Sequence, residues 1–90
     1  MKYFVYMLEN AKGRHYIGIT TDPIRRVAEH NKGSAKSTRP FGPWKIIYTE
    51  EFTTRREACK KEWFLKHSDG RKEKTSIIAR HQDSLNGSSK

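Results

Sequence analysis

The sequence predicts a small α+β domain. Three runs rich in strand-forming residues are interspersed with segments that begin at helix-capping residues and continue with apolar residues at helical spacing. The chain has 90 residues, enough for one hydrophobic core and too few for two. We therefore expect one domain over residues 1–81, followed by a polar, disordered tail over residues 82–90.

The first two strands are predicted to form a β-hairpin. Residues 3–8 are all apolar or aromatic, which favours a central strand that is covered on both faces. A turn-like segment follows, and residues 15–20 form the return strand. Tyr16 and Gly18 share one face of this strand, and a glycine inside a strand often marks a close backbone approach.

The first helix is predicted to start with Asp22 as its N-cap and Pro23 at its first position, and to end at Gly33. Three of its apolar residues recur at helical spacing and should face the core. These residues are Ile24, Val27 and Ala28.

The second half of the chain is predicted to contain one strand and two helices. A loop rich in Gly, Ser, Thr and Pro covers residues 32–43, and a strand follows over residues 44–52. A capping-box pattern at Thr54 opens a helix that should end near Lys66. A last, polar helix is expected over residues 71–81, with two adjacent isoleucines as its only aliphatic anchors.

The chain is strongly basic. Nineteen Lys and Arg residues against ten Asp and Glu residues leave a formal net charge of +9. Such an excess favours a polyanion as partner, and nucleic acid is the commonest one. The alternative is a cationic surface that serves only solubility. The single cysteine, Cys59, excludes an internal disulfide, and no apolar run has the length of a signal peptide or membrane span. We therefore expect a cytoplasmic, nucleoid-associated protein without a membrane partner.

One carboxylate falls on the apolar stripe of the second helix. Ala58, Glu62 and Leu65 occupy positions i, i+4 and i+7, with Cys59 and Trp63 beside them. An unpaired carboxylate is costly in such a place, and the neighbouring lysines lie largely on other faces. The pattern favours a metal ion or a buried cation as the partner of Glu62. The alternative is a side chain that reaches water at the edge of the stripe.

Arg26 and His30 stand at i and i+4 on the first helix, flanking its predicted apolar stripe. From there both side chains can point along the sheet toward Tyr16. The alternative is a solvated arginine and a half-buried histidine. Arg25 is expected to pair with Glu29 at i+4 on the solvated surface.

Tyr6 and Tyr16 lie on the two strands of the hairpin, where tyrosines alone usually indicate packing. Their spacing with Arg26, His30 and the distant Glu62 is more specific. Over about residues 3–65 this arrangement resembles the GIY-YIG nuclease superfamily, and within it the small single-domain, uncharacterised bacterial members.

The resemblance is carried by short motifs. Tyr16-Ile17-Gly18 matches the second half of the family name in full, whereas Phe4-Val5-Tyr6 keeps only the tyrosine of the first half. Glu62 occupies the place of the metal-binding glutamate. No segment corresponds to an added DNA-binding or zinc domain. The active-site asparagine of some branches has no match, since Asn86 falls in the predicted tail. Asn31, beside His30, is a candidate for a local contribution only.

The resemblance implies a three-stranded antiparallel sheet flanked by helices, and one Mg²⁺ or Mn²⁺ ion held by Glu62 and water. Tyr6 would act as general base or orient the attacking water, with its phenol pKa lowered by the arginine and the metal. Arg26 would stabilise the charge that develops on the phosphate. Tyr16 and His30 would form hydrogen bonds with the phosphate or the attacking water.

The leading hypothesis is a divalent-metal-dependent DNA endonuclease of repair or recombination, with DNA favoured over RNA as substrate. The alternatives are a non-catalytic nucleic-acid-binding module and a recruitment domain for a protein partner, which would use aromatic residues such as Trp44, Trp63 and Phe64. Phosphate contacts are expected from cations of the central loop and of the second helix. These cations are Lys32, Lys36, Arg39, Lys60 and Lys61.

Overall fold

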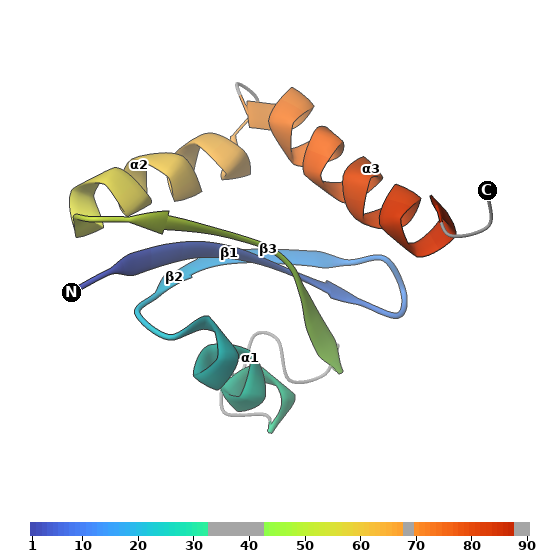
Figure 1. Cartoon of the computed structure of the whole chain (residues 1–90), viewed down its shortest axis with the longest axis horizontal. Coiled ribbons are helices and arrows are strands. Elements are labelled where there is room, and N and C mark those ends of the chain that lie inside the picture. Colours follow the sequence, from blue (N-terminus) through green and yellow to red (C-terminus); the bar gives the residue numbers. More distant parts are fainter. Residues whose placement is uncertain (33–42, 68–69, 88–90) are drawn as a thin grey trace.

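A three-stranded antiparallel sheet with helices on both faces forms the protein in the computed structural model, which describes residues 1–32, 43–67 and 70–87 (Figure 1). The sheet order is β2-β1-β3. Its strands are β1 (Tyr3–Asn10), β2 (His15–Thr20) and β3 (Trp44–Phe52). One face is covered by α1 (Pro23–Asn31), and the other by α2 (Arg55–Lys66) and α3 (Arg71–Gly87). The predicted α+β class and antiparallel sheet are confirmed.

Strand β1 is the central strand, as its apolar sequence predicts. Four consecutive residues from Val5 to Leu8 are buried, because helices cover both faces of the sheet. Successive side chains alternate between those faces. Val5 and Met7 therefore pack with the residues of α2 and α3, whereas Tyr6 and Leu8 pack with those of α1.

Strand β1 extends to Asn10, two residues beyond its predicted end at Leu8. Asn10 is buried, and its side-chain oxygen accepts hydrogen bonds from the backbone N–H groups of Lys12 (3.1 Å) and Arg14 (2.8 Å). Gly13 adopts a positive φ of 82°, which glycine tolerates best. The side chain of Asn10 thus satisfies the turn's backbone donors and lets β1 continue to the turn itself.

Helix α1 starts as predicted and Val27 packs against the core as expected, but the core positions predicted for Ile24 and Ala28 are wrong. The side chain of Asp22 accepts a hydrogen bond from the backbone N–H of Arg25 at 3.2 Å. Ile24, however, is 77% exposed and Ala28 is also turned away from the core clusters, whereas His30 is buried. The residues of α1 that meet the sheet include Val27 and His30. The buried hydroxyl of Tyr6 needs a hydrogen-bonding partner, and His30 supplies it. The helix orientation that buries His30 leaves Ile24 in solvent.

The two C-terminal helices pack on the opposite face. Helix α2 has the predicted bounds, and the hydroxyl of Thr54 caps it by accepting from the N–H of Glu57 at 3.2 Å. Helix α3 runs to Gly87, so the predicted helix end near His81 is wrong, and the disordered tail predicted from residue 82 stays a prediction. Buried Ile77 and the contact of His81 with Glu9 (3.5 Å) hold α3 against the sheet, which favours continuation of the helix.

Within the described residues, no helix combines the length and the apolar character that a membrane span requires.

The register of α1 predicts different costs for the same change at two isoleucines. Ile24→Ala should alter the free energy of unfolding by less than about 0.5 kcal/mol, because the side chain is exposed. Ile77→Ala removes a buried side chain of α3 from the core and should lower the free energy of unfolding by roughly 2–5 kcal/mol. Urea denaturation of both variants measures these values. Equal costs would contradict the orientation of α1.

Candidate active site

Two phenols and a glycine form the sheet side of the site. Tyr6 on β1 lies opposite Gly18 on β2, and Leu8 lies opposite Tyr16. The two tyrosines thus share the face covered by α1, with ring centroids 6.2 Å apart. A Cβ atom at Gly18 would lie 2.6 Å from the phenol oxygen of Tyr6. The absence of a side chain at Gly18 is therefore what lets the buried Tyr6 ring lie across β2, and the predicted close approach is confirmed.

Helix α1 adds a histidine and an arginine to these phenols. The Oη atom of Tyr6 lies 3.1 Å from Nε2 of His30, and both side chains are about 1% exposed. The rings of Tyr16 and His30 meet edge to face at 4.8 Å. The guanidinium of Arg26 lies close enough to the hydroxyl of Tyr6 to influence it, and pairs with Glu29 at 3.0 Å. The structure therefore brings together four predicted site residues, which we call the phenol–histidine cluster: Tyr6, Tyr16, Arg26 and His30.

Burial sets the protonation states in this cluster. It raises the pKa of Tyr6 to about 12, although the adjacent Arg26 acts in the opposite direction. It also lowers the pKa of His30, and the positive charge of Arg26 adds to that effect. In the protein without metal the phenol pKa is thus raised, and its lowering beside a bound metal stays a prediction. At neutral pH the phenol keeps its proton and the imidazole is neutral, so Tyr6 can donate to Nε2 of His30.

Arg26 connects the buried cluster to solvent. A hollow of about 350 Å³ lies between the end of β2 and α1, and Arg26 is one of its lining residues. The side chain of Arg26 is 36% exposed, so an anion can reach the guanidinium from outside. Arg25 is 76% exposed and pairs with Glu29 at 3.4 Å, as predicted. Glu29 also binds Arg26, which the i,i+3 spacing of the two residues could have indicated.

The fifth predicted residue, Glu62, lies in the other layer of the molecule. Its side chain is 26% exposed, and its Oε2 atom is 3.1 Å from Nζ of Lys66 at i+4. The expectation that neighbouring lysines face elsewhere is therefore wrong for Lys66.

The neighbouring lysine shows which edge of the sheet Glu62 approaches. Lys61 pairs with Glu50 of β3 at 3.5 Å and with Glu73 of α3. Lys61 and Glu62 flank the buried Ala58–Leu65 stripe on opposite sides, since successive helical residues are rotated by about 100°. Glu62 consequently faces the edge strand β2, which separates it from the phenol–histidine cluster.

Comparison with known proteins identifies the family. The model of the GIY-YIG catalytic domain matches residues 2–75. The chain belongs to the GIY-YIG family. It is 42% identical over 83 residues to a UPF0213 protein of Streptococcus pneumoniae, covering 91% of this chain and 83% of that protein. It is 38% identical over 84 residues to a UPF0213 protein of Listeria monocytogenes, covering 92% and 93% of the two chains. The solution NMR structure of a UPF0213 protein from Bacillus halodurans has a TM-score of 0.55 at 36% identity, covering 90% and 87% of the chains.

The residues of this GIY-YIG chain suit a hydrated divalent ion better than a protein cage. No group of three or more His, Cys, Asp or Glu residues in the described part of the chain is placed to hold a metal. Mg²⁺ commonly keeps several waters and binds through one or two carboxylates together with substrate phosphates. The single carboxylate of Glu62 fits that mode, provided that an ion replaces Lys66.

The cations predicted to bind phosphate differ in exposure and in ion pairing. Lys32 and Lys60 are exposed, whereas Lys61 is only 19% exposed and is held in its two ion pairs. Those pairs remove Lys61 from the surface that a polyanion could reach. Lys36 and Arg39 lie outside the described residues.

Asn31 has a structural contact instead of a place in the phenol–histidine cluster. Its side-chain amide donates to the carbonyl of Trp44 at 2.9 Å and accepts from its N–H at 2.6 Å. This pair of hydrogen bonds ties the end of α1 to the start of β3.

The Tyr6–Gly18 contact predicts that Gly18→Ala displaces the phenol from His30. The cost should be about 1–3 kcal/mol in the free energy of unfolding, as for other overpacked core sites. Urea denaturation measures the stability, and NMR of the Tyr6 ring and His30 imidazole reports the hydrogen bond. An unchanged pair of signals would show that the ring does not depend on this glycine.

The lowered pKa of His30 predicts a stability that depends on pH. Because the unfolded chain binds the His30 proton more readily, the free energy of unfolding should fall as pH drops below about 6.5, until the folded pKa is reached. Urea denaturation between about pH 5 and pH 8 measures this slope. In His30→Gln the slope should be smaller, since the other three histidines are common to both proteins. Parallel curves would assign the dependence to those histidines.

Proposed function

We propose that this protein is a divalent-metal-dependent endonuclease that hydrolyses phosphodiester bonds in DNA, in repair or recombination. The observation that supports the proposal best is the buried Tyr6–His30 hydrogen bond with the guanidinium of Arg26 at its solvent edge. A proton acceptor and a fixed positive charge are thereby placed side by side. The GIY-YIG catalytic domain and the net charge of +9 agree with a nucleic-acid substrate.

The raised pKa of Tyr6 in the protein without metal favours one of two forms of base catalysis. With a pKa of about 12, forming a free tyrosinate at pH 7 would cost about 7 kcal/mol. A stored phenolate is therefore unfavourable. We propose that the attacking water transfers a proton to the Tyr6 oxygen while the Tyr6 proton moves to Nε2 of His30. The hydroxide attacks phosphorus, the leaving oxygen takes a proton from solvent, and the imidazolium later releases its own.

The remaining residues have electrostatic and positioning tasks. Arg26 stabilises the negative charge that develops on the phosphate, and Tyr16 donates a hydrogen bond to the phosphate or water. Glu62, released from Lys66, would hold the Mg²⁺ or Mn²⁺ ion. That ion would supply Lewis-acid stabilisation of the leaving oxygen. Because Glu62 and the phenol–histidine cluster lie on either side of β2, the substrate should approach at this edge of the sheet.

The Glu62–Lys66 ion pair favours one competing function, a non-catalytic module that binds or recruits partners to nucleic acid. In such a module the pair would be permanent. Binding without metal-dependent cleavage would identify it. The assay uses single-stranded, duplex, flap and four-way DNA with and without Mg²⁺ or Mn²⁺.

Glu62→Gln should abolish cleavage and leave DNA affinity nearly unchanged. The amide matches the carboxylate in shape but carries no charge to hold a divalent ion. Cleavage is measured on the four DNA forms, with circular dichroism as the folding control. Wild-type cleavage by this variant would refute the metal role, and loss of the fold would instead assign Glu62 to a structural ion pair.

Arg26→Ala should lower the cleavage rate by about 10²-fold or more, because a preorganised charge is removed from the phosphate. Arg25→Ala is the matched control, since Arg25 is the adjacent residue and projects into solvent. Single-turnover rates with saturating protein separate this effect from binding. Similar decreases in both variants would remove Arg26 from its proposed role.

A further inference from the structure

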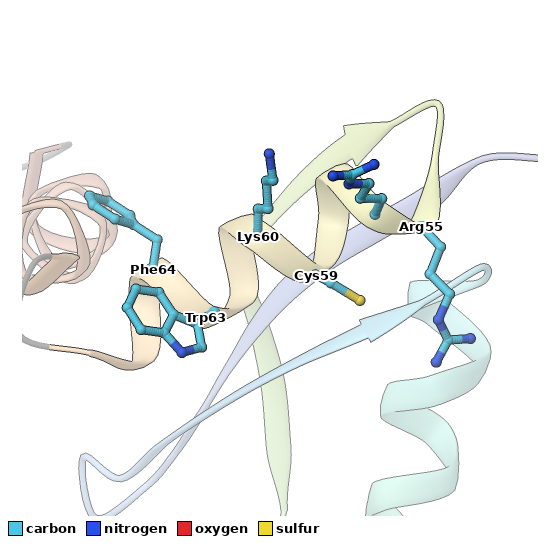
Figure 2. Close-up of a pocket in the computed structure, with 6 residues that line it drawn as sticks. Arg55, Cys59, Lys60, Trp63 and Phe64 are labelled. Carbon is cyan, nitrogen blue, oxygen red and sulfur yellow. The ribbon is translucent and has the colours of Figure 1, made fainter.

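The outer face of α2 carries a hollow that the phenol–histidine cluster does not use. It has a volume of about 710 Å³ and lies on the side of α2 turned away from the sheet (Figure 2). We call it the α2 groove. Its lining residues are Arg55, Arg56, Cys59, Lys60, Trp63 and Phe64. Trp63 is 54% exposed, although tryptophan is among the most costly side chains to leave in water.

We propose that the α2 groove binds an unpaired segment of nucleic acid, with one base stacked on Trp63 and the adjacent phosphates on Arg55, Arg56 and Lys60. This inference rests on the proposed function, because it takes nucleic acid as the substrate. It specifies that the substrate contains single-stranded nucleotides. It also assigns their binding to a helix face that is distinct from the phenol–histidine cluster.

The indole of Trp63 is ordered before any ligand arrives. His67 stacks on it with ring centroids 4.0 Å apart and an interplanar angle of 18°. The Nδ1 atom of His67 also lies 2.6 Å from the carbonyl oxygen of Trp63. One ring face is therefore covered, and the exposed remainder can receive a base at little entropic cost. Within a duplex the faces of a base are covered by its neighbours, so an unpaired base fits this position.

The charges around Trp63 complement a phosphate backbone. Arg55, Arg56 and Lys60 are exposed, and within the described residues none of them forms an ion pair. The acid nearest in sequence to these cations is Glu57, whose carboxylate accepts hydrogen bonds from two threonine hydroxyls at the helix start. Free cations beside an ordered aromatic ring are the combination that single-strand-binding surfaces use.

The position of the α2 groove relative to Glu62 suits a substrate channel. Glu62 precedes Trp63 and is rotated from it by about 100° around the helix. Cys59 and Trp63 project from the same side of α2 (Figure 2). A nucleic-acid strand that crosses the side of α2 with Cys59 and Trp63 therefore passes next to the helix face that carries Glu62.

Binding is tested without metal, in EDTA, so that cleavage does not enter the result. A labelled thymidine oligonucleotide and a blunt duplex of equal length are titrated with wild type, Trp63→Ala and Trp63→Phe. Trp63→Ala should weaken single-strand binding by about 5- to 150-fold, the range expected for one stacked base. Trp63→Phe should retain most of the affinity, and Ile24→Ala is the control for removal of an exposed apolar side chain. Equal affinity of Trp63→Ala and wild type would overturn the proposal.

The phosphate-binding role of the three cations is tested by salt dependence. Replacing Arg55, Arg56 and Lys60 together by Gln should make the slope of log affinity against log salt shallower. The expected change on a single strand is roughly 0.7 for each phosphate that the variant no longer neutralises. Lys12→Gln is the single-charge control, because Lys12 lies in the β1–β2 turn at the end of the sheet remote from α2 (Figure 1). An unchanged slope in the triple variant would overturn the phosphate assignment.

Cys59 provides an independent reporter, because it is the chain's single cysteine and is exposed in the α2 groove. The oligonucleotide should slow its reaction with a thiol reagent in wild type and much less in Trp63→Ala. Protection that is equal in both would overturn the proposal. Sedimentation of the free proteins tests the other occupant: a dimer that Trp63→Ala dissociates would assign the α2 groove to a second copy.

The two proposals fail in different ways. A protein that cleaves DNA but binds single strands independently of Trp63 overturns the α2 groove alone. A protein that binds single strands through Trp63 but never cleaves supports the groove and overturns the endonuclease assignment.

Discussion

The hydrogen bond between Tyr6 and His30 organises the whole site. Both groups are buried, and a buried polar group without a partner costs about 1–3 kcal/mol. Satisfying the pair turns the polar face of α1 toward the sheet and leaves Ile24 in water. It also requires Gly18, because the Tyr6 ring crosses β2 where a Cβ atom would stand. The strand motif with Tyr6 and Gly18 and the helix residue His30 thus contribute to the same buried contact.

The two layers of the molecule divide the chemistry between them. The face under α1 holds the hydrogen-bonded Tyr6–His30 pair and the charge of Arg26, whereas the face under α2 holds the carboxylate of Glu62. The edge strand β2 lies between these faces, so a substrate that uses both must approach along it. Ion pairs organise the second layer: Lys61 links α2 to β3 and α3, and Lys66 holds Glu62.

The cations of α2 separate into structural and free ones by the face on which they lie. Lys61 faces inward and is neutralised by Glu50 and Glu73, whereas Lys60, the preceding residue, faces outward beside Trp63. A net positive charge therefore does not by itself locate a binding surface. The orientation of each cation on its helix decides whether a phosphate can reach it.

The order of the elements, the caps at Asp22 and Thr54 and the central position of β1 follow from the sequence alone, because they depend on local chemistry and on the length of apolar runs. The spacing along the sequence likewise singled out the four residues that the structure brings together, Tyr6, Tyr16, Arg26 and His30. The register of α1 and the raised pKa of Tyr6 emerged only from the packed molecule. The i,i+4 spacing of Glu62 and Lys66 allowed an ion pair, but only the structure showed that it forms. The orientation of α1 and the phenol pKa depend on which groups are buried together across elements. The Glu62–Lys66 pair depends on side-chain conformations at the edge of a helix face. Hydrophobic periodicity along one segment carries neither kind of information.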